Sequence, residues 1–270
     1  MLGAAAGDII GSVYEFDTIK TKDFPLFSER SRFTDDSVLT MAVANAICRG
    51  VPYKRAIREI GNRYPESGYG SSFVLWLFGL MDDPYYSWGN GSAMRVSPVG
   101  FAFKSREKVL EEAERSAEIT HDHPEGIKGA RATALAVFFA AGGADKEEME
   151  EEIEKEFGYD LDRTVADIRP DYQWEASCQK TVPEAIVCFL DSVSFEDAIR
   201  NAVSLGGDSD TLACIAGSIA EAYYREIPMD ILIEVKRRLP GDLWEICREF
   251  YRDYGLPEVR AQVEALQGKR

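Results

Sequence analysis

Apolar residues recur at intervals of three and four positions along most of this chain, which is the spacing of one face of an α-helix. Alternation of apolar and polar positions, the pattern typical of β-strands, is scarce. Proline and glycine lie mostly between the periodic segments and separate them. The pattern therefore predicts an all-α protein. Segments with helical spacing cover residues 38–48, 109–119, 129–141, 183–190, 195–205, 212–224 and 229–239.

Two stretches, 130–136 and 213–220, are rich in alanine. Because alanine is small, helices built from them can approach their neighbours closely in the middle of a bundle. The acidic stretch 145–156 keeps a sparse apolar stripe, so we interpret it as a helix with a solvated face. No internal repeat and no break in composition marks a domain boundary. We expect residues 1–270 to form a single domain, a compact orthogonal helical bundle.

The composition narrows the possible partners of the chain. Hydrophobic residues make up 45% of the 270 positions, which indicates a globular protein with a large core. The net charge of −16 disfavours nonspecific binding to nucleic acid or to an anionic membrane, because both depend on basic surfaces. A small anionic ligand stays possible, since backbone N–H groups and metal ions can hold phosphates. We expect a monomer with no direct affinity for nucleic acid.

The cysteines and the N-terminal segment indicate the cellular compartment in which the protein is expected. Five scattered cysteines without CxxC spacing are typical of free thiols in a reducing environment. The first residues lack a basic region, and Asp8 interrupts them before the core of a signal peptide develops. No apolar run approaches the roughly 20 residues of a membrane-spanning helix. We expect a cytoplasmic protein.

Two short acidic segments, residues 34–37 and 206–211, carry most of the functional information. Each places carboxylates and hydroxyls at adjacent or alternate positions in an otherwise apolar stretch, where unpaired charge is unfavourable unless a cation compensates it. Oxygen donors without histidine or cysteine suit Mg²⁺ or Mn²⁺ and argue against zinc. Four carboxylates carry more charge than one divalent ion needs, which favours a site for two ions.

A structural interpretation of the same segments is also open. Aspartate, serine and threonine before an apolar run are ordinary helix N-caps, so either segment alone fits a turn followed by a capped helix. The two segments together exceed what capping requires, because one oxygen acceptor is enough for each helix start. A metal site explains the additional carboxylates.

Five motifs in order resemble those of the ADP-ribosylglycohydrolases, also called ADP-ribosyl-acceptor hydrolases, a family that includes the dinitrogenase reductase activating glycohydrolases. The resemblance runs from Gly3 to about Tyr224. It implies an all-α bundle that holds two Mg²⁺ ions in a cleft and hydrolyses the bond between ADP-ribose and its acceptor. The motifs are Gly7–Ser12 with Glu15, Phe33–Ser37, Gly89–Arg95, Thr120–Pro124 and Ser204–Thr211.

The resemblance also implies roles for individual residues. The metal ligands it implies are Thr34, Asp35, Asp36, Asp208, Asp210 and Thr211, with Asp210 a candidate for the shared ligand. The substrate-binding residues it implies are Gly70, Ser87, Trp88, Gly89, Asn90, Gly91, Ser92, Met94 and His121. Among these, Gly89–Gly91 resembles the phosphate-binding loop, and Trp88 lies where a stacking aromatic is found. Glu15 resembles a mobile acidic residue of the branch that hydrolyses serine-linked ADP-ribose and O-acetyl-ADP-ribose.

The chemistry agrees with these roles. Hydrolysis at the anomeric carbon of a ribose passes through a transition state with oxocarbenium character, so the site must orient the ribose and activate water. Candidates for the proton-transferring carboxylate are Glu15, Asp208 and Asp35, and the sequence does not decide among them. His121 is a better candidate for a ligand contact than His123, which precedes Pro124 in a structural setting.

Two alternatives from other classes stay open. A catalytically silent ADP-ribose-binding or structural protein could keep the same fold, since fold does not determine function. The intact set of candidate metal ligands argues against it. A two-metal phosphoesterase would use the same cations but usually recruits histidine ligands, and this chain has two histidines, both in one motif. The acceptor that carries the ADP-ribose, whether arginine, serine, O-acetyl, a nucleobase or another group, is left open.

Overall fold

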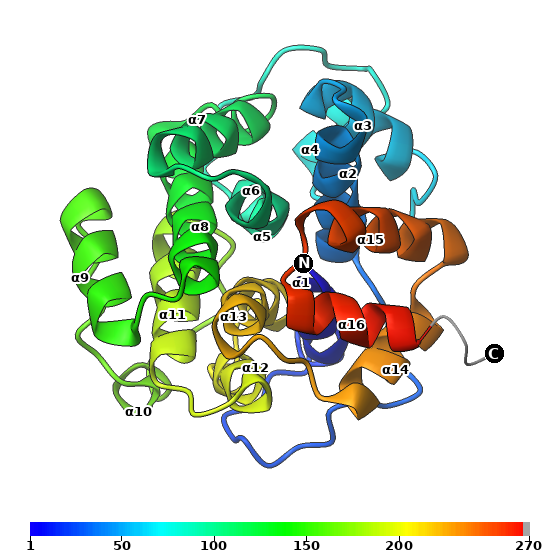
Figure 1. Cartoon of the computed structure of the whole chain (residues 1–270). Helices are drawn as coiled ribbons and strands as arrows, with labels where there is room; N and C mark the ends of the chain where they lie inside the picture. The colour runs from blue at the N-terminus through cyan, green and yellow to red at the C-terminus, as the bar shows by residue number, and fades with distance from the viewer. Residues whose placement is uncertain (267–270) are drawn as a thin grey trace.

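The computed structural model describes residues 1–266, which form sixteen helices and no β-sheet (Figure 1). The all-α prediction is confirmed. Within these residues a single antiparallel bridge joins Gly89 to Ser177. The helices are α1 (Leu2–Gly11), α2 (Asp35–Arg49), α3 (Tyr53–Gly61), α4 (Ser71–Leu77), α5 (Gly91–Met94), α6 (Ser97–Ala102), α7 (Arg106–Ala117), α8 (Pro124–Gly142), α9 (Lys146–Phe157), α10 (Val165–Ile168), α11 (Cys178–Leu190), α12 (Phe195–Ser204), α13 (Ser209–Tyr224), α14 (Met229–Arg238), α15 (Gly241–Tyr254) and α16 (Pro257–Ala265).

The segments predicted from apolar spacing lie in helices α2, α7, α8, α11, α12, α13 and α14 and extend at most two residues beyond them, whereas several of these helices begin three to five residues earlier than predicted. The acidic stretch forms α9, with Met149 and Ile153 buried. The predicted segments do not include α1, because all ten of its residues are buried and a helix that is apolar on every side has no stripe. They also do not include α15, although it buries Leu243, Cys247 and Phe250 at helical spacing.

Helices α1 and α13 lie against each other at the centre of the molecule (Figure 1). A Cβ atom placed on Gly7 would lie 1.9 Å from the carbonyl oxygen of Ala213, and one on Gly3 would lie 2.2 Å from that of Gly217. Glycine at these positions therefore lets the two backbones touch. This contact brings an aspartate near the start of the chain beside an aspartate 202 positions later, since Asp8 lies in α1 and Asp210 in α13.

The two acidic segments are both helix starts. Thr34 is the N-cap of α2, and its hydroxyl accepts a hydrogen bond from the backbone N–H of Asp36. Asp208 precedes α13 but makes no side-chain capping bond. Capping therefore accounts for Thr34 and leaves the carboxylates of both segments for another role. Among the described residues, no helix combines the length and the apolar character needed to cross a membrane.

Candidate functional site

The carboxylates of the two acidic segments meet those of the N-terminal region in two groups. Asp8, Asp36 and Asp210 form one group, and Glu15, Asp208 and Asp210 form the other. Within each group, one oxygen atom from each residue lies within 4.8 Å of the others. Asp210 belongs to both groups, so the two clusters are contiguous. This arrangement offers two adjacent positions for cations.

Asp8 is absent from the site residues predicted from the sequence. It is fully buried and accepts hydrogen bonds from the backbone N–H of Thr34 at 2.9 Å, from the Thr34 hydroxyl at 2.7 Å and from the backbone N–H of Ser37 at 3.0 Å. The Ser37 hydroxyl also donates to it. A single charged residue inside the apolar segment 2–11 is the signal that could have identified it.

Burial dominates the electrostatics of the site. It raises the pKa of Asp8 and of Asp208 to about 6 and the pKa of Glu15 to about 7. Burial and then neighbouring carboxylates hold the pKa values of Asp36 and Asp210 well above their usual range. The charged groups that act on Asp36 are all carboxylates. The site therefore concentrates acidic groups, and among the charges that act on Glu15 only Arg32 is a cation.

The donor set fits a hard divalent cation. Asp36 Oδ1 is buried and has no hydrogen-bond partner among the described residues, which is unfavourable unless another group occupies that position. Its second oxygen, Oδ2, lies 3.4 Å from the hydroxyls of Thr34 and Thr211. Every potential ligand in the two groups is an oxygen atom, and oxygen ligands suit Mg²⁺ or Mn²⁺.

Asp35 lies at the edge of this cluster and belongs to neither three-carboxylate group. Its backbone N–H donates to the Ser67 carbonyl at 2.8 Å, which joins α2 to the loop before α4. Burial and then the charge of Asp210 hold the pKa of Asp35 well above its usual value. Gly70, in the same loop, is exposed and is the N-cap of α4.

The Gly89–Gly91 loop is joined directly to the acidic cluster. The Asn90 side chain is buried and donates from Nδ2 to Asp208 Oδ2 at 2.7 Å and to the Thr181 hydroxyl at 3.1 Å. The backbone N–H of Asn90 donates to the Ala176 carbonyl at 2.8 Å, beside the bridge between Gly89 and Ser177. The loop therefore has a fixed position next to the second group of carboxylates.

The ring of His121 lies behind this loop. A Cβ atom on Gly91 would lie 3.2 Å from His121 Nε2, and one on Gly89 would lie 3.6 Å from the same atom. Glycine at position 91 thus gives the ring room to face the loop. His123 is separate from it, because its Nδ1 accepts the backbone N–H of Glu125 and caps α8. The two histidines therefore do not converge on one point.

The other predicted substrate-binding residues on either side of the Gly89–Gly91 loop are not all directed at one point. The Ser87 hydroxyl accepts the backbone N–H of Gly89 at 3.1 Å. Trp88 is 52% exposed, and its ring meets that of His123 edge to face. The Ser92 hydroxyl is buried and donates to the Gly126 carbonyl, so it is turned toward α8. Met94 is also buried, and its carbonyl accepts from Cys214 Sγ at 3.3 Å.

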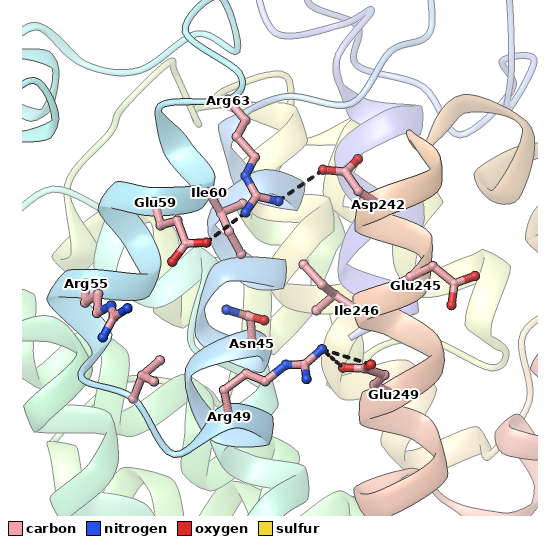
Figure 2. A pocket seen from close by; sticks show the side chains of 11 residues that line it. Asn45, Arg49, Arg55, Glu59, Ile60, Arg63, Asp242, Glu245, Ile246 and Glu249 are labelled. Carbon is pink, nitrogen blue, oxygen red and sulfur yellow. Dashed lines mark hydrogen bonds and ion pairs between the residues drawn. The ribbon is translucent and has the colours of Figure 1, made fainter.

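A cavity of about 560 Å³ lies elsewhere, between α2, α3 and α15 (Figure 2). Ion pairs line it: Arg49 contacts Glu249, and Arg63 contacts Glu59 and Asp242. It contains none of the residues of the two carboxylate groups. The carboxylate groups and this cavity are therefore in different places.

Comparisons with known proteins place the chain among hydrolases of ADP-ribose glycosidic bonds. It belongs to the ADP-ribosylglycohydrolase family, whose model matches residues 1–259. It is 27% identical to the ADP-ribosylhydrolase ARH3 of Xenopus tropicalis, over 94% of this chain and 91% of that protein. It is 26% identical to the ADP-ribosylarginine hydrolase Tri1 of Pseudomonas putida (strain GB-1), over 83% and 69%. A solved structure described as an ADP-ribosylglycohydrolase-related protein complex aligns with a TM-score of 0.71 and 25% identity, over 94% of this chain and 96% of that chain.

Proposed function

We propose that this chain is a Mg²⁺-dependent hydrolase that removes ADP-ribose from an acceptor and so reverses ADP-ribosylation. The observation that carries the proposal is the bond between Asn90 and Asp208. It joins a glycine loop that suits a diphosphate to a cluster of carboxylates that suits divalent cations. ADP-ribose contains a diphosphate and a ribose with vicinal hydroxyls, so its two ends match the two parts of the site.

Two cations would be held by the groups that share Asp210. Asp36 and Asp210, with the hydroxyls of Thr34 and Thr211, would hold one ion, and Asp208, Asp210 and Glu15 would hold the other. When bound, such ions supply Lewis acidity toward ribose hydroxyls and water. Asp35 is the remaining candidate ligand, at the edge of the first group.

The protein supplies the proton-transferring groups. Glu15 is half-buried beside Asp208 and Asp210, and its pKa is raised to about 7, chiefly by burial. A cation held by Asp208 and Asp210 would lower this pKa, and the ionised Glu15 carboxylate could then accept a proton from a nearby water. Asp208 is the second candidate, since Asn90 holds one of its oxygens and its side chain is also in hydrogen-bond contact with Asp210. We propose that Glu15 transfers the proton and that Asp208 orients the group with which Glu15 exchanges it.

The rest of the substrate would extend along the Gly89–Gly91 loop. Two glycines let phosphate oxygens approach the backbone closely without cationic side chains. His121 faces the loop from behind, and the exposed ring of Trp88 offers a surface on which a base can stack. A phosphate ligand is therefore compatible with a chain whose net charge is −16.

A panel of defined ADP-ribosyl conjugates tests the function and identifies the acceptor. Arginine-linked, serine-linked and O-acetyl conjugates would each be incubated with the protein and Mg²⁺, and free ADP-ribose would be measured. We expect release from at least one conjugate, with Glu15 favouring the serine-linked or O-acetyl compounds. Binding of ADP-ribose without release from any conjugate would support the silent binding protein instead.

A further inference from the structure

Lys20 is an exposed residue whose ammonium group is occupied by main-chain carbonyls. Its Nζ donates to the carbonyl oxygens of Arg169 at 2.8 Å, of Tyr172 at 2.5 Å and of Leu205 at 2.5 Å. An ammonium group has three protons, so these bonds use all of them. Arg169 follows α10 and Leu205 follows α12, where the last carbonyls lack partners within the helix and a cation is favourable. Lys20 therefore joins three separate segments of the chain.

Two of these segments meet directly before Asp208. The backbone of Gly206 is in the left-handed region at φ +67°, and a Cβ atom there would lie 2.7 Å from the Ile19 carbonyl oxygen. A Cβ atom on Gly207 would lie 2.3 Å from the ring of Tyr172. The chain that leads into Asp208 is therefore in close contact with the residues on either side of the ammonium group's bonds.

The third segment is the connection 12–34 between α1 and α2, which carries Glu15. Within the described residues no hydrogen bond holds the Glu15 carboxylate, so its place in the carboxylate group depends on how the backbone is anchored. Before Glu15, the backbone N–H of Tyr14 donates to the Gly11 carbonyl at 2.8 Å. After it, Lys20 is the first residue that bonds to segments outside the connection. Glu15 therefore lies between two fixed points of the backbone.

We propose that Lys20 is a positioning residue that sets the separation of Glu15 from Asp208 and Asp210. This role rests on the proposed function, in which Glu15 completes the second cation position and transfers a proton. The three carboxylates each place an oxygen within 4.8 Å of the others. A misplacement of about 1 Å can lower a rate by about 10²-fold. Loss of the anchor should therefore impair the second cation position and the chemical step, and spare the first cation position.

Lys22 provides a matched control in the same connection. Its ammonium group pairs with Asp197 in α12, away from the carbonyls that Lys20 holds. Lys20→Met and Lys22→Met each remove one positive charge and keep a long side chain. Lys20→Arg keeps the charge and several donors, so its effect should be smaller than that of Lys20→Met. It takes the place of Lys20→Met in both experiments if that variant does not fold.

Binding of Mn²⁺ to the ligand-free protein tests this role without a substrate. Electron paramagnetic resonance measures free Mn²⁺ while each metal-free protein is titrated. In Lys20→Met we expect one of two Mn²⁺ affinities to fall about 10-fold or more, the usual effect of a residue that orients a ligand, and the other to change less than about 2-fold. Lys22→Met should match the native protein. Unchanged affinities in Lys20→Met would overturn the role.

A double-mutant cycle tests whether Lys20 acts through Glu15. Single-turnover release of ADP-ribose at saturating Mg²⁺ is measured for the native protein, Lys20→Met, Glu15→Gln and the double variant. We expect Lys20→Met to lower the rate about 10- to 10²-fold in the native protein but less than about 3-fold in the Glu15→Gln background, where the group that it positions is absent. Equal losses in both backgrounds would make Lys20 a merely structural residue and overturn the role.

The two measurements separate this role from the proposed function. A protein that binds Mn²⁺ but releases no ADP-ribose from any conjugate would refute the proposed function, and the Mn²⁺ affinities of Lys20→Met would then decide the role of Lys20. Hydrolysis without coupling between Lys20 and Glu15 would refute the role alone. A native protein that neither binds Mn²⁺ nor hydrolyses a conjugate would refute both.

Discussion

Asp8 accepts two hydrogen bonds from Thr34, one from the Thr34 backbone N–H at 2.9 Å and one from the Thr34 hydroxyl at 2.7 Å. Because Thr34 is the N-cap of α2, a carboxylate in α1 fixes the start of the helix that presents Asp36. Its four hydrogen bonds, two of them from Ser37, occupy most of the acceptor capacity of Asp8. It therefore acts on the site chiefly by orienting other ligands.

Replacing Asp8 should test this orienting role. Asp8→Asn keeps the volume of the side chain but replaces one acceptor oxygen by an NH₂ group, which faces hydrogen-bond donors of Thr34 and Ser37. Outer-sphere partners of this kind typically contribute about 10- to 100-fold to metal affinity or activity. We expect Mg²⁺ affinity, measured by titration of activity, to fall by that order. Normal Mg²⁺ affinity in Asp8→Asn would contradict the role.

Removal of divalent cations should abolish hydrolysis. Incubation with a chelator followed by added Mg²⁺ or Mn²⁺ should eliminate and then restore release of ADP-ribose, because oxygen ligands bind these ions well. Zn²⁺ at the same concentration should restore less activity. Full turnover by metal-free protein would refute the two-metal proposal.

Asp36→Ala and Asp210→Ala should each lower turnover by about 10²-fold or more, because each removes a ligand itself. The metal-free variants should unfold at a higher temperature than the metal-free native protein, since mutual repulsion among buried carboxylates is reduced. Glu59→Gln, on the remote cavity of Figure 2, is a matched control that should leave turnover unchanged. Near-normal rates at saturating Mg²⁺ in either aspartate variant would show that the ligands are misassigned.

Glu15→Gln should separate chemistry from binding. The substitution removes the ionisable group but keeps its volume, so kcat should fall by about 10²- to 10⁴-fold while ADP-ribose still binds. Single-turnover hydrolysis and calorimetric titration of the same variant give the two quantities. An unchanged single-turnover rate would remove Glu15 from the mechanism, and a loss of affinity with unchanged kcat would make it a binding residue.

The stability of the metal-free protein should depend on pH in a defined direction. The pKa values of Asp8 and Asp208 are raised to about 6 from 3.8, so the folded chain holds these protons more tightly than the unfolded chain. The free energy of unfolding should therefore fall as pH rises from about 4 through about 6. One pKa unit corresponds to about 1.4 kcal/mol, which sets the scale at a few kcal/mol.

Mg²⁺ should reverse this loss of stability by compensating the carboxylates. Thermal unfolding with and without Mg²⁺ should show a larger increase in Tm at about pH 7.5 than at about pH 5, because ligands must be deprotonated to bind. An increase in Tm that is equal at both pH values would argue against the carboxylate cluster as the binding site.

Apolar spacing predicted eight of the sixteen described helices, and clustered carboxylates predicted both acidic segments, because these are local features. It did not predict Asp8 as part of the site, since the hydrogen bonds to Thr34 and Ser37 join residues 26 and 29 positions apart. The bond between Asn90 and Asp208 spans 118 positions and likewise depends on the packing of distant helices. Sequence patterns identify such residues as candidates, whereas tertiary contacts determine which of them meet.

The glycine contact between α1 and α13 also affects how the protein can be made. Ser209 donates to the Gly11 carbonyl across 198 positions, so α1 leaves the ribosome long before its partner is synthesised. At about 5 to 20 residues per second, this interval is about ten to forty seconds. Throughout that time this apolar helix lacks its main partner and can pack mainly on α2 and the segment before it. Chaperone demand during translation should therefore concentrate on the first ten residues, and the cation site can be completed only after synthesis has reached α13.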